Sequence, residues 1–261
     1  MKKIIPLFVC LMSLMGCSGI TYNATGYKPL EGSNVSFDGI NSLSVDWING
    51  NVIIEQGDDS NALVNESESE YPLYYKVNNQ KLFIEVAKSG TSSTIINKLN
   101  KDLHIVVPSF LNYLYVSAVN ASLYLKGDVT IEKGTFKTVN GNIKMDHYKA
   151  DESSFDGVNN SIDIANIDYA TKEQKDICAI EEGTSECIQP EPVALEHTVD
   201  MDLVNCIVNM GISSKTGYEC YSSSINSFVT SDFGNQATYE PDLIRLYLDL
   251  VNSTVNIKKV D

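Results

Sequence analysis

The chain has 261 residues, with 34 Asp and Glu against 19 Lys and Arg, and its formal net charge at pH 7 is −15. An acidic surface opposes binding to nucleic acid and to a bare anionic membrane. Because Arg245 is the single arginine, bidentate recognition of phosphate cannot be widespread. Val, Ile, Thr, Tyr, Asn and Ser dominate and long runs with a period of 3.6 are missing, so the composition predicts an all-β protein.

Residues 1–16 have the features of a signal peptide. Two lysines precede a short apolar core, from Ile4 to Met15, that is too short to span a bilayer as a helix. Leu14-Met15-Gly16-Cys17 resembles the lipobox of bacterial lipoproteins, although Met15 is a less usual residue there. The resemblance implies cleavage before Cys17 and attachment of acyl chains such as palmitate, which would anchor the chain to a membrane. An ordinary secretory signal cleaved nearby is the alternative.

Ser18 follows the cysteine, and no Asp stands there. In the lipoprotein class that the motif resembles, this favours the outer membrane of the cell envelope. The periplasmic and the surface face of that membrane are both left open. Residues 17–34 are polar and contain several glycines, so we expect a flexible tether between the anchor and a β-domain over residues 35–261.

The first part of this domain contains short strand signals. Alternating residues predict strands at 42–47 and 51–55, and a hairpin at 73–86 turns at Asn78-Asn79. Residues 88–101 predict a loop or one helical turn, and Pro108 ends a strand at 103–107. The acidic turn at 57–61 lacks the ligand spacing of a known calcium loop, so we predict no metal site there.

One short frame recurs through the rest of the chain. It reads apolar residue, Asn, two small or polar residues, apolar, any, apolar, and it starts at 119, 139, 158, 204, 225 and 251, with an early copy at 48. Asn favours a turn because it tolerates the left-handed backbone region. The alternating tail predicts a half-buried strand. The repeat-turn asparagines are Asn49, Asn120, Asn140, Asn159, Asn205, Asn226 and Asn252.

The spacing of these copies indicates the architecture. The first intervals are 20 and 19 residues, and a fixed period of this size is typical of repeat proteins. The copies share one phase, which favours parallel stacking of strands about 4.8 Å apart. We therefore predict a β-solenoid or β-helix-like domain with about 20 residues per coil.

An acidic insertion interrupts the repeats at about residues 168–202. From Asp163 to Asp202 there are eleven acidic residues against two lysines. Export to an oxidising compartment predicts two disulfides among the four cysteines that remain after Cys10 and Cys17 are set aside. Of three connectivities we favour the two local ones, Cys178–Cys187 and Cys206–Cys220.

Two segments carry a resemblance to a known family. Phe136-Lys-Thr-Val-Asn-Gly-Asn-Ile143 and Leu103-His-Ile-Val-Val-Pro108, which Leu114-Tyr-Val116 follows, resemble a bacterial adhesin-like family with β-strand repeats, a domain of unknown function. The resemblance covers roughly residues 43–164. It implies an envelope or secreted location and an all-β body, and it supplies no catalytic residues.

The sequence offers little for catalysis. His104, His147 and His197 lie in different segments, and motifs such as G-x-S-x-G and H-E-x-x-H are missing. We therefore predict a noncatalytic, adhesin-like envelope module without a cofactor or a metal, which binds a glycan or an envelope or host protein and no nucleic acid. A periplasmic structural or envelope-stress lipoprotein is the alternative. A polysaccharide-cleaving solenoid is the third, with Asp146, Asp163 and Asp168 as its carboxylates.

Overall fold

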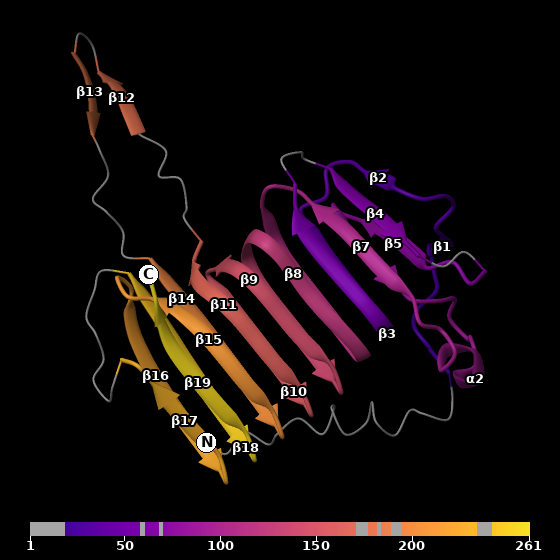
Figure 1. Ribbon diagram of the computed structural model, residues 1–261. Helices are drawn as coiled ribbons and strands as arrows, with labels where there is room; N and C mark the ends of the chain where they lie inside the picture. Colours follow the sequence, from indigo (N-terminus) through magenta and orange to yellow (C-terminus); the bar gives the residue numbers. More distant parts are fainter. Residues whose placement is uncertain are drawn as a thin grey trace.

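The protein is almost entirely β-structure in a computed structural model (Figure 1). The structure describes residues 19–57, 61–67, 70–170, 195–233 and 242–261, together with the backbone of two strands between 177 and 188. The signal peptide and the lipidation candidate Cys17 lie outside the described residues. The all-β prediction is confirmed.

The strands form one large sheet and one small hairpin. The large sheet contains 17 strands within the described residues, and α2 (Ser93–Ile96) is a single helical turn beside it. Before α2 come β1 (Lys28–Pro29), β2 (Val35–Phe37), β3 (Ser42–Gln56), β4 (Ala62–Glu66), β5 (Tyr74–Asn78) and β6 (Lys81–Glu85). After it come β7 (Asp102–Val107), β8 (Leu111–Val139), β9 (Asn142–Ala150), β10 (Glu152–Val158), β11 (Ser161–Tyr169), β14 (Glu196–Val204), β15 (Ile207–Ser213), β16 (Gly217–Ile225), β17 (Phe228–Ser231), β18 (Leu243–Val251) and β19 (Thr254–Val260).

Most of these strands pair in parallel and in two rows. In the first row, β6 pairs with the first half of β3, which pairs with β8, and β8 is followed by β10, β14, β18 and β16. In the second row, β7 pairs with the second half of β3, and β8, β9, β11, β15, β19 and β17 follow. Figure 1 shows the strands side by side in one stack, with β1–β7 at one end and β16–β19 at the other.

At seven places the chain passes from the first row to the second through an asparagine. Asn49, Asn120, Asn140, Asn159, Asn205, Asn226 and Asn252 all have φ between 49° and 60°. Asn accepts this left-handed conformation at a lower cost than other residues with a Cβ. Five of these side chains in successive layers are also joined by four hydrogen bonds. Each amide Nδ2 donates to the Oδ1 of the preceding layer at 3.0–3.2 Å, from Asn252 through Asn205, Asn159 and Asn140 to Asn120.

The core lies inside the angle between the two rows. Alternate residues of each strand point inward, as with Leu43, Val45 and Trp47 on β3, which are all buried. Equivalent residues of neighbouring strands stack, and the rings of Phe136 and Phe155 lie 5.0 Å apart. Because a single layer cannot bury its own apolar face, each layer depends on its neighbours for stability.

The order of the layers departs from the order of the chain near the C-terminus. β18 and β19 lie between β14–β15 and β16–β17, since β14 pairs with β18 and β16 pairs with β18. The strands β16 and β17, which precede them in sequence, therefore form the last layer. The frame spacing alone could not reveal this insertion.

The segment predicted as a flexible tether packs onto the domain over much of its length. Ile20 exchanges backbone hydrogen bonds with residues 90 and 91, β1 pairs with β5, and Leu30 is buried. Gly19 has a φ of +82°, and a Cβ there would lie 2.4 Å from the Thr91 carbonyl oxygen, so glycine is required at this contact. The tether prediction is wrong for residues 19–30, because apolar and β-forming residues anchor the segment among its glycines.

The insertion leaves the stack between β11 and β14. Asp168 still belongs to β11 and Asp202 to β14, so the insertion is shorter than the predicted 168–202. Within it, β12 (Ile177–Glu181) and β13 (Thr184–Ile188) form an antiparallel pair whose register sets Cys178 opposite Cys187. The side chains of these cysteines lie outside the described residues.

The other predicted disulfide does not form. Cys206 and Cys220 are both free thiols. Cys206 lies at the corner after β14. Cys220 lies within β16, where it is in register with Leu246 on β18. It precedes by seven residues the corner residue Ser227, whose hydroxyl accepts a hydrogen bond from the amide of the corner residue Ser253. Seven residues of strand correspond to roughly 20 Å, well beyond disulfide reach. The two cysteines are close in sequence but not in space, because Cys220 lies within the extended strand β16, far from the corners of the stack.

Candidate functional site

A groove of about 490 Å³ lies at the N-terminal end of the stack. Residues 19–22 form one wall, α2 and the residues after β6 form another, and the outer face of β3 and β8 forms the floor. Its apolar lining includes Ile20, Ile48, Val86, Ile96, Val119 and Val139. The groove therefore combines the docked N-terminal segment with the beginning of the asparagine ladder.

Two carboxyl groups occupy the floor of the groove. Asp46 and Glu85 are register partners on β3 and β6, so their side chains project side by side. Burial and the neighbouring Asp46 carboxylate raise the pKa of Glu85 to about 8. Burial also raises the pKa of Asp46, against the opposing effect of a hydrogen bond from Ser117. A carboxyl pair with raised pKa values in a cleft is a candidate functional group.

The asparagine ladder ends at this groove. Asn120 accepts the last amide hydrogen bond of the ladder, and its own layer neighbour Asn49 turns away to donate to the Ile96 carbonyl of α2 at 3.0 Å. Both Asn120 and Asn140 line the groove. Every amide of the ladder donates its hydrogen bond in the direction of Asn120. The positive, N–H end of the aligned amide dipoles therefore lies at the groove.

A second candidate surface lies at the opposite end. Within the described part of the chain, five of the eight exposed large hydrophobic side chains belong to β15–β18. We call them the aromatic patch: Ile207, Tyr221, Ile225, Phe228 and Tyr247. Ile225 and Phe228 flank the last asparagine corner and are 63% and 72% exposed. Exposed apolar groups gathered at one end of a soluble domain mark an interaction surface.

The centre of the aromatic patch is a pair of stacked tyrosines. The rings of Tyr221 and Tyr247 lie 5.3 Å apart at an interplanar angle of 14°, so together they form a flat platform. Glu219 on the same strand accepts a hydrogen bond from the Tyr221 hydroxyl and pairs with Arg245 at 2.8 Å. Arg245 also pairs with Glu196. The platform is thus bordered by charged groups whose geometry is already fixed.

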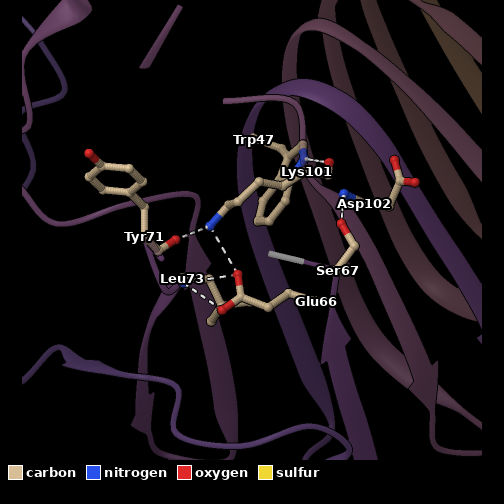
Figure 2. A network of polar contacts seen from close by, with 7 residues as sticks. All are labelled: Trp47, Glu66, Ser67, Tyr71, Leu73, Lys101 and Asp102. Atoms are coloured by element: carbon tan, nitrogen blue, oxygen red, sulfur yellow. Dashed lines mark hydrogen bonds and ion pairs between the residues drawn. The ribbon is translucent and has the colours of Figure 1, made fainter. Parts of the chain in front are cut away.

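A buried ion pair holds the strands near the groove together (Figure 2). The Lys101 ammonium donates to Glu66 at 2.9 Å and to the Tyr71 carbonyl at 2.7 Å, and it lies 5.4 Å from the centre of the Trp47 ring. Glu66 in turn accepts from the Leu73 amide. The Trp47 indole donates to the Lys101 carbonyl. This network is structural, because its polar atoms face one another inside the protein.

A second buried network crosses the middle of the stack. The Ser153 hydroxyl lies 2.7 Å from both the Tyr148 hydroxyl and Nε2 of His197, and Nδ1 of His197 lies 2.7 Å from the Asp168 carbonyl oxygen. Burial lowers the pKa of His197 to about 4, so the imidazole is neutral at pH 7 and donates to that carbonyl. The serine and histidine resemble a nucleophile and base in type only, since both are fully enclosed.

The carboxylates predicted from sequence are distributed over the outer face. Asp146 accepts hydrogen bonds from the Tyr124 hydroxyl and the Gly127 amide. Asp163 and Asp168 both lie on β11. Asp163 is in register with Lys144 on β9, and Asp168 lies near His147, also on β9. None of the three lines the groove. Among the described residues, no group of three or more His, Cys, Asp or Glu side chains is arranged to hold a metal ion.

Sequence reasoning missed the residues of both candidate surfaces. Asp46 and Glu85 occupy ordinary outward positions of alternating strands and carry no local signal. The tyrosines did carry one, because Tyr221 and Tyr247 stand five residues before the corner residues Asn226 and Asn252. Aligning the copies of the frame upstream of each Asn would have placed both rings at one outward position.

Comparisons with known proteins give structural likenesses only. No family model matches the chain, and no curated protein matches it. A candidate cell adhesion protein from Clostridium sporogenes aligns at 13% identity over 90% of this chain and 98% of its own, with a TM-score of 0.36. A candidate adhesin from Bacteroides fragilis aligns at 10% identity over 88% and 98%, with a TM-score of 0.43.

A candidate adhesin from Parabacteroides merdae aligns at 12% identity over 94% of this chain and all of its own, with a TM-score of 0.33. No residue and no activity is transferred from these proteins. Among the residues that the structure describes, no helix has the length and hydrophobicity of a membrane span.

Proposed function

We propose that this protein is a noncatalytic, lipid-anchored module of the bacterial cell envelope, which binds a glycan through the aromatic patch. The observation that carries the proposal is the stacked pair Tyr221 and Tyr247 beside the Arg245–Glu219 ion pair. The apolar face of a sugar ring packs on a flat aromatic surface, and its hydroxyl groups bond to fixed charged groups at the rim. A protein partner is the other class of ligand, and Ile225 and Phe228 would favour it.

The fold that we propose behind this surface is a β-solenoid. Parallel pairing in two rows, asparagine corners and a repeat of about 20 residues support it. In a solenoid the outer side chains of successive layers form continuous lines, so a repetitive ligand meets a repetitive surface. The terminal position of the aromatic patch suits presentation away from an anchor at the N-terminus.

Two finer features complete the proposal. Acyl chains on Cys17 would attach the protein to the outer membrane, on whichever face it works. A disulfide between Cys178 and Cys187 would close the β12–β13 hairpin, since these residues are direct partners across the two antiparallel strands. The support for the disulfide is the backbone register.

The groove supports one alternative, a glycan-cleaving enzyme. Two carboxyl groups, one held protonated, are the groups that glycosidases use. In such enzymes, however, the carboxyl groups flank the scissile bond. Asp46 and Glu85 project side by side from the floor of the groove, which favours binding over cleavage. If the enzyme proposal were right, Glu85→Gln would abolish release of reducing ends from envelope polysaccharides.

The binding proposal is tested with a glycan array and calorimetry. Tyr221→Ala and Tyr247→Ala should each weaken binding of the recognised glycan at least tenfold, because each removes half of the platform. Phe110→Ala is the matched control, since Phe110 is also exposed but lies outside the patch. If the recognised glycan bound with unchanged affinity to a variant that carries both Tyr221→Ala and Tyr247→Ala, the aromatic patch would be refuted as the binding site. Binding of a protein in its place, with the same sensitivity, would select the alternative ligand class.

A further inference from the structure

The position of the groove relative to the lipidation candidate has a geometric consequence. The groove wall begins at Gly19, and Cys17 precedes Gly19 by two residues. Two residues of extended chain span at most ~7 Å. The hydrogen bonds of Ile20 and Tyr22 with residues 87–91 fix the segment that follows. An acyl group on Cys17 would therefore start within reach of the groove wall at Gly19.

We propose that the groove holds one of the acyl chains carried by Cys17 of the same molecule, so that this end of the domain lies on the membrane surface. The inference rests on the lipidation of Cys17 in the proposed function. It adds an occupant for the groove and a fixed orientation for the domain.

The lining of the groove suits a hydrocarbon chain. Aliphatic side chains come from all of its walls: Ile20 from the N-terminal segment, Ile96 from α2, and Val119 and Val139 from β8. Burying a methylene contributes about 0.8 kcal/mol. The two carboxyl groups on the floor are compatible with this, because Tyr27 hydrogen-bonds to Glu85 and Ser117 to Asp46, and burial holds Glu85 protonated near neutral pH.

The charge around the groove also differs from that of the rest of the chain. Residues 86–101, which contribute a wall of the groove, contain no Asp or Glu, although the net charge of the chain is −15. Lys88 and Lys98 are exposed in this segment. A lysine near an anionic leaflet contributes about 1 kcal/mol of attraction. These lysines thus suit the groove end to lie against lipid headgroups.

The test uses Trp47, the only tryptophan, which lies at the groove. The full mature chain with Cys17→Ser is titrated with a fatty acid that carries a nitroxide in the middle of its chain. We expect saturable quenching of Trp47 fluorescence, reversed by unlabelled palmitate. Val139→Phe should weaken this binding at least tenfold, because it fills the groove. Val204→Phe is the matched control, since Val204 has the same frame position outside the groove and the same partial burial.

A second arm identifies the source of the chain. The natural, acylated protein in vesicles of phosphatidylethanolamine and phosphatidylglycerol should not take up the nitroxide fatty acid, because its own chain fills the groove. The inference would be overturned if the acylated protein took up as much nitroxide fatty acid as the Cys17→Ser protein. It would also be overturned if Val139→Phe and Val204→Phe lost the same amount of fatty-acid affinity. Mass spectrometry of Cys17 separates the two proposals: an unmodified thiol refutes the anchor itself, whereas an acylated Cys17 with an accessible groove refutes only the occupant. Urea midpoints establish that both Val variants are folded.

Discussion

Replacing Lys101 with Met should lower the free energy of unfolding by about 3–5 kcal/mol. The substitution keeps an unbranched side chain that is one heavy atom shorter, and it removes the charge. Lys101 is fully buried and Glu66 is 7% exposed, so the Glu66 carboxylate would lose its counter-ion without gaining water. The Tyr71 carbonyl would lose its donor as well.

The predicted loss of unfolding free energy has several contributions, which follow from the contacts in Figure 2. A buried charge left without its partner accounts for most of the loss. The cation over the Trp47 ring contributes about 0.5–2 kcal/mol. Leu73 still donates its amide to Glu66, which limits the cost. Removing both charges, in Lys101→Met with Glu66→Leu, should restore a substantial part of the stability, because no uncompensated charge remains.

The assay is urea unfolding followed by Trp47 fluorescence. Lys126→Met is the control, since Lys126 pairs with Glu55 on the surface, where the side chains are 55% and 27% exposed. Surface pairs contribute about 0–1 kcal/mol, so this variant should be nearly neutral. If Lys101→Met lost less than about 1 kcal/mol, or if the double variant were no better than the single one, the buried ion pair would not have the role assigned to it.

Other predictions concern titration, the ladder and the thiols. Since burial lowers the pKa of His197 to about 4 in the folded state, the contribution of His197 to stability should fall by about 1.4 kcal/mol per pH unit as the pH drops from about 6.5 to 4; the difference in unfolding free energy between wild type and His197→Gln in urea titrations should change by this amount, and a difference that stays constant over that range would contradict the prediction. The raised pKa of Glu85 acts in the opposite sense: the contribution of Glu85 to stability is fully present below the unfolded pKa of about 4.3 and is lost as the pH rises through 8, so Glu85→Gln should be more stable than wild type at pH 9. Asn140→Ala should cost about 3 kcal/mol, because it loses ladder bonds and must hold φ at 53°, whereas Asn140→Gly should cost about 1 kcal/mol less; equal costs would exclude the backbone effect. Thiol titration of the unreduced, denatured mature protein should find two reactive thiols, those of Cys206 and Cys220; four would refute the bond in the β12–β13 hairpin.

The local pattern predicted the corners of this fold well. The frame singled out seven asparagines, and the structure has each of them in the left-handed region. This works because one backbone conformation restricts residue choice strongly at one position. The hairpin around Asn78-Asn79 is also confirmed, since β5 and β6 pair antiparallel across it.

Features that depend on contacts between distant segments were not predictable in this way. The insertion of β18–β19 before the last layer places Tyr247 beside Tyr221, although 26 residues separate them. Lys101 can be buried because Glu66 on β4, which is distant in sequence, neutralises its charge. The residues next to Lys101 in sequence do not distinguish it from a surface lysine. Cys206 and Cys220 were assigned to each other by proximity in sequence, which strand direction made irrelevant.

We propose that the molecule has a membrane end at the groove and a binding end at the aromatic patch. The most direct test is hydrogen exchange of the acylated protein in phosphatidylethanolamine and phosphatidylglycerol vesicles, compared with the soluble Cys17→Ser protein. We predict slower exchange on vesicles in residues 86–101 and unchanged exchange in β16 and β17. Protection of β16 and β17 by the vesicles, with residues 86–101 unchanged, would show the opposite orientation and contradict the proposal.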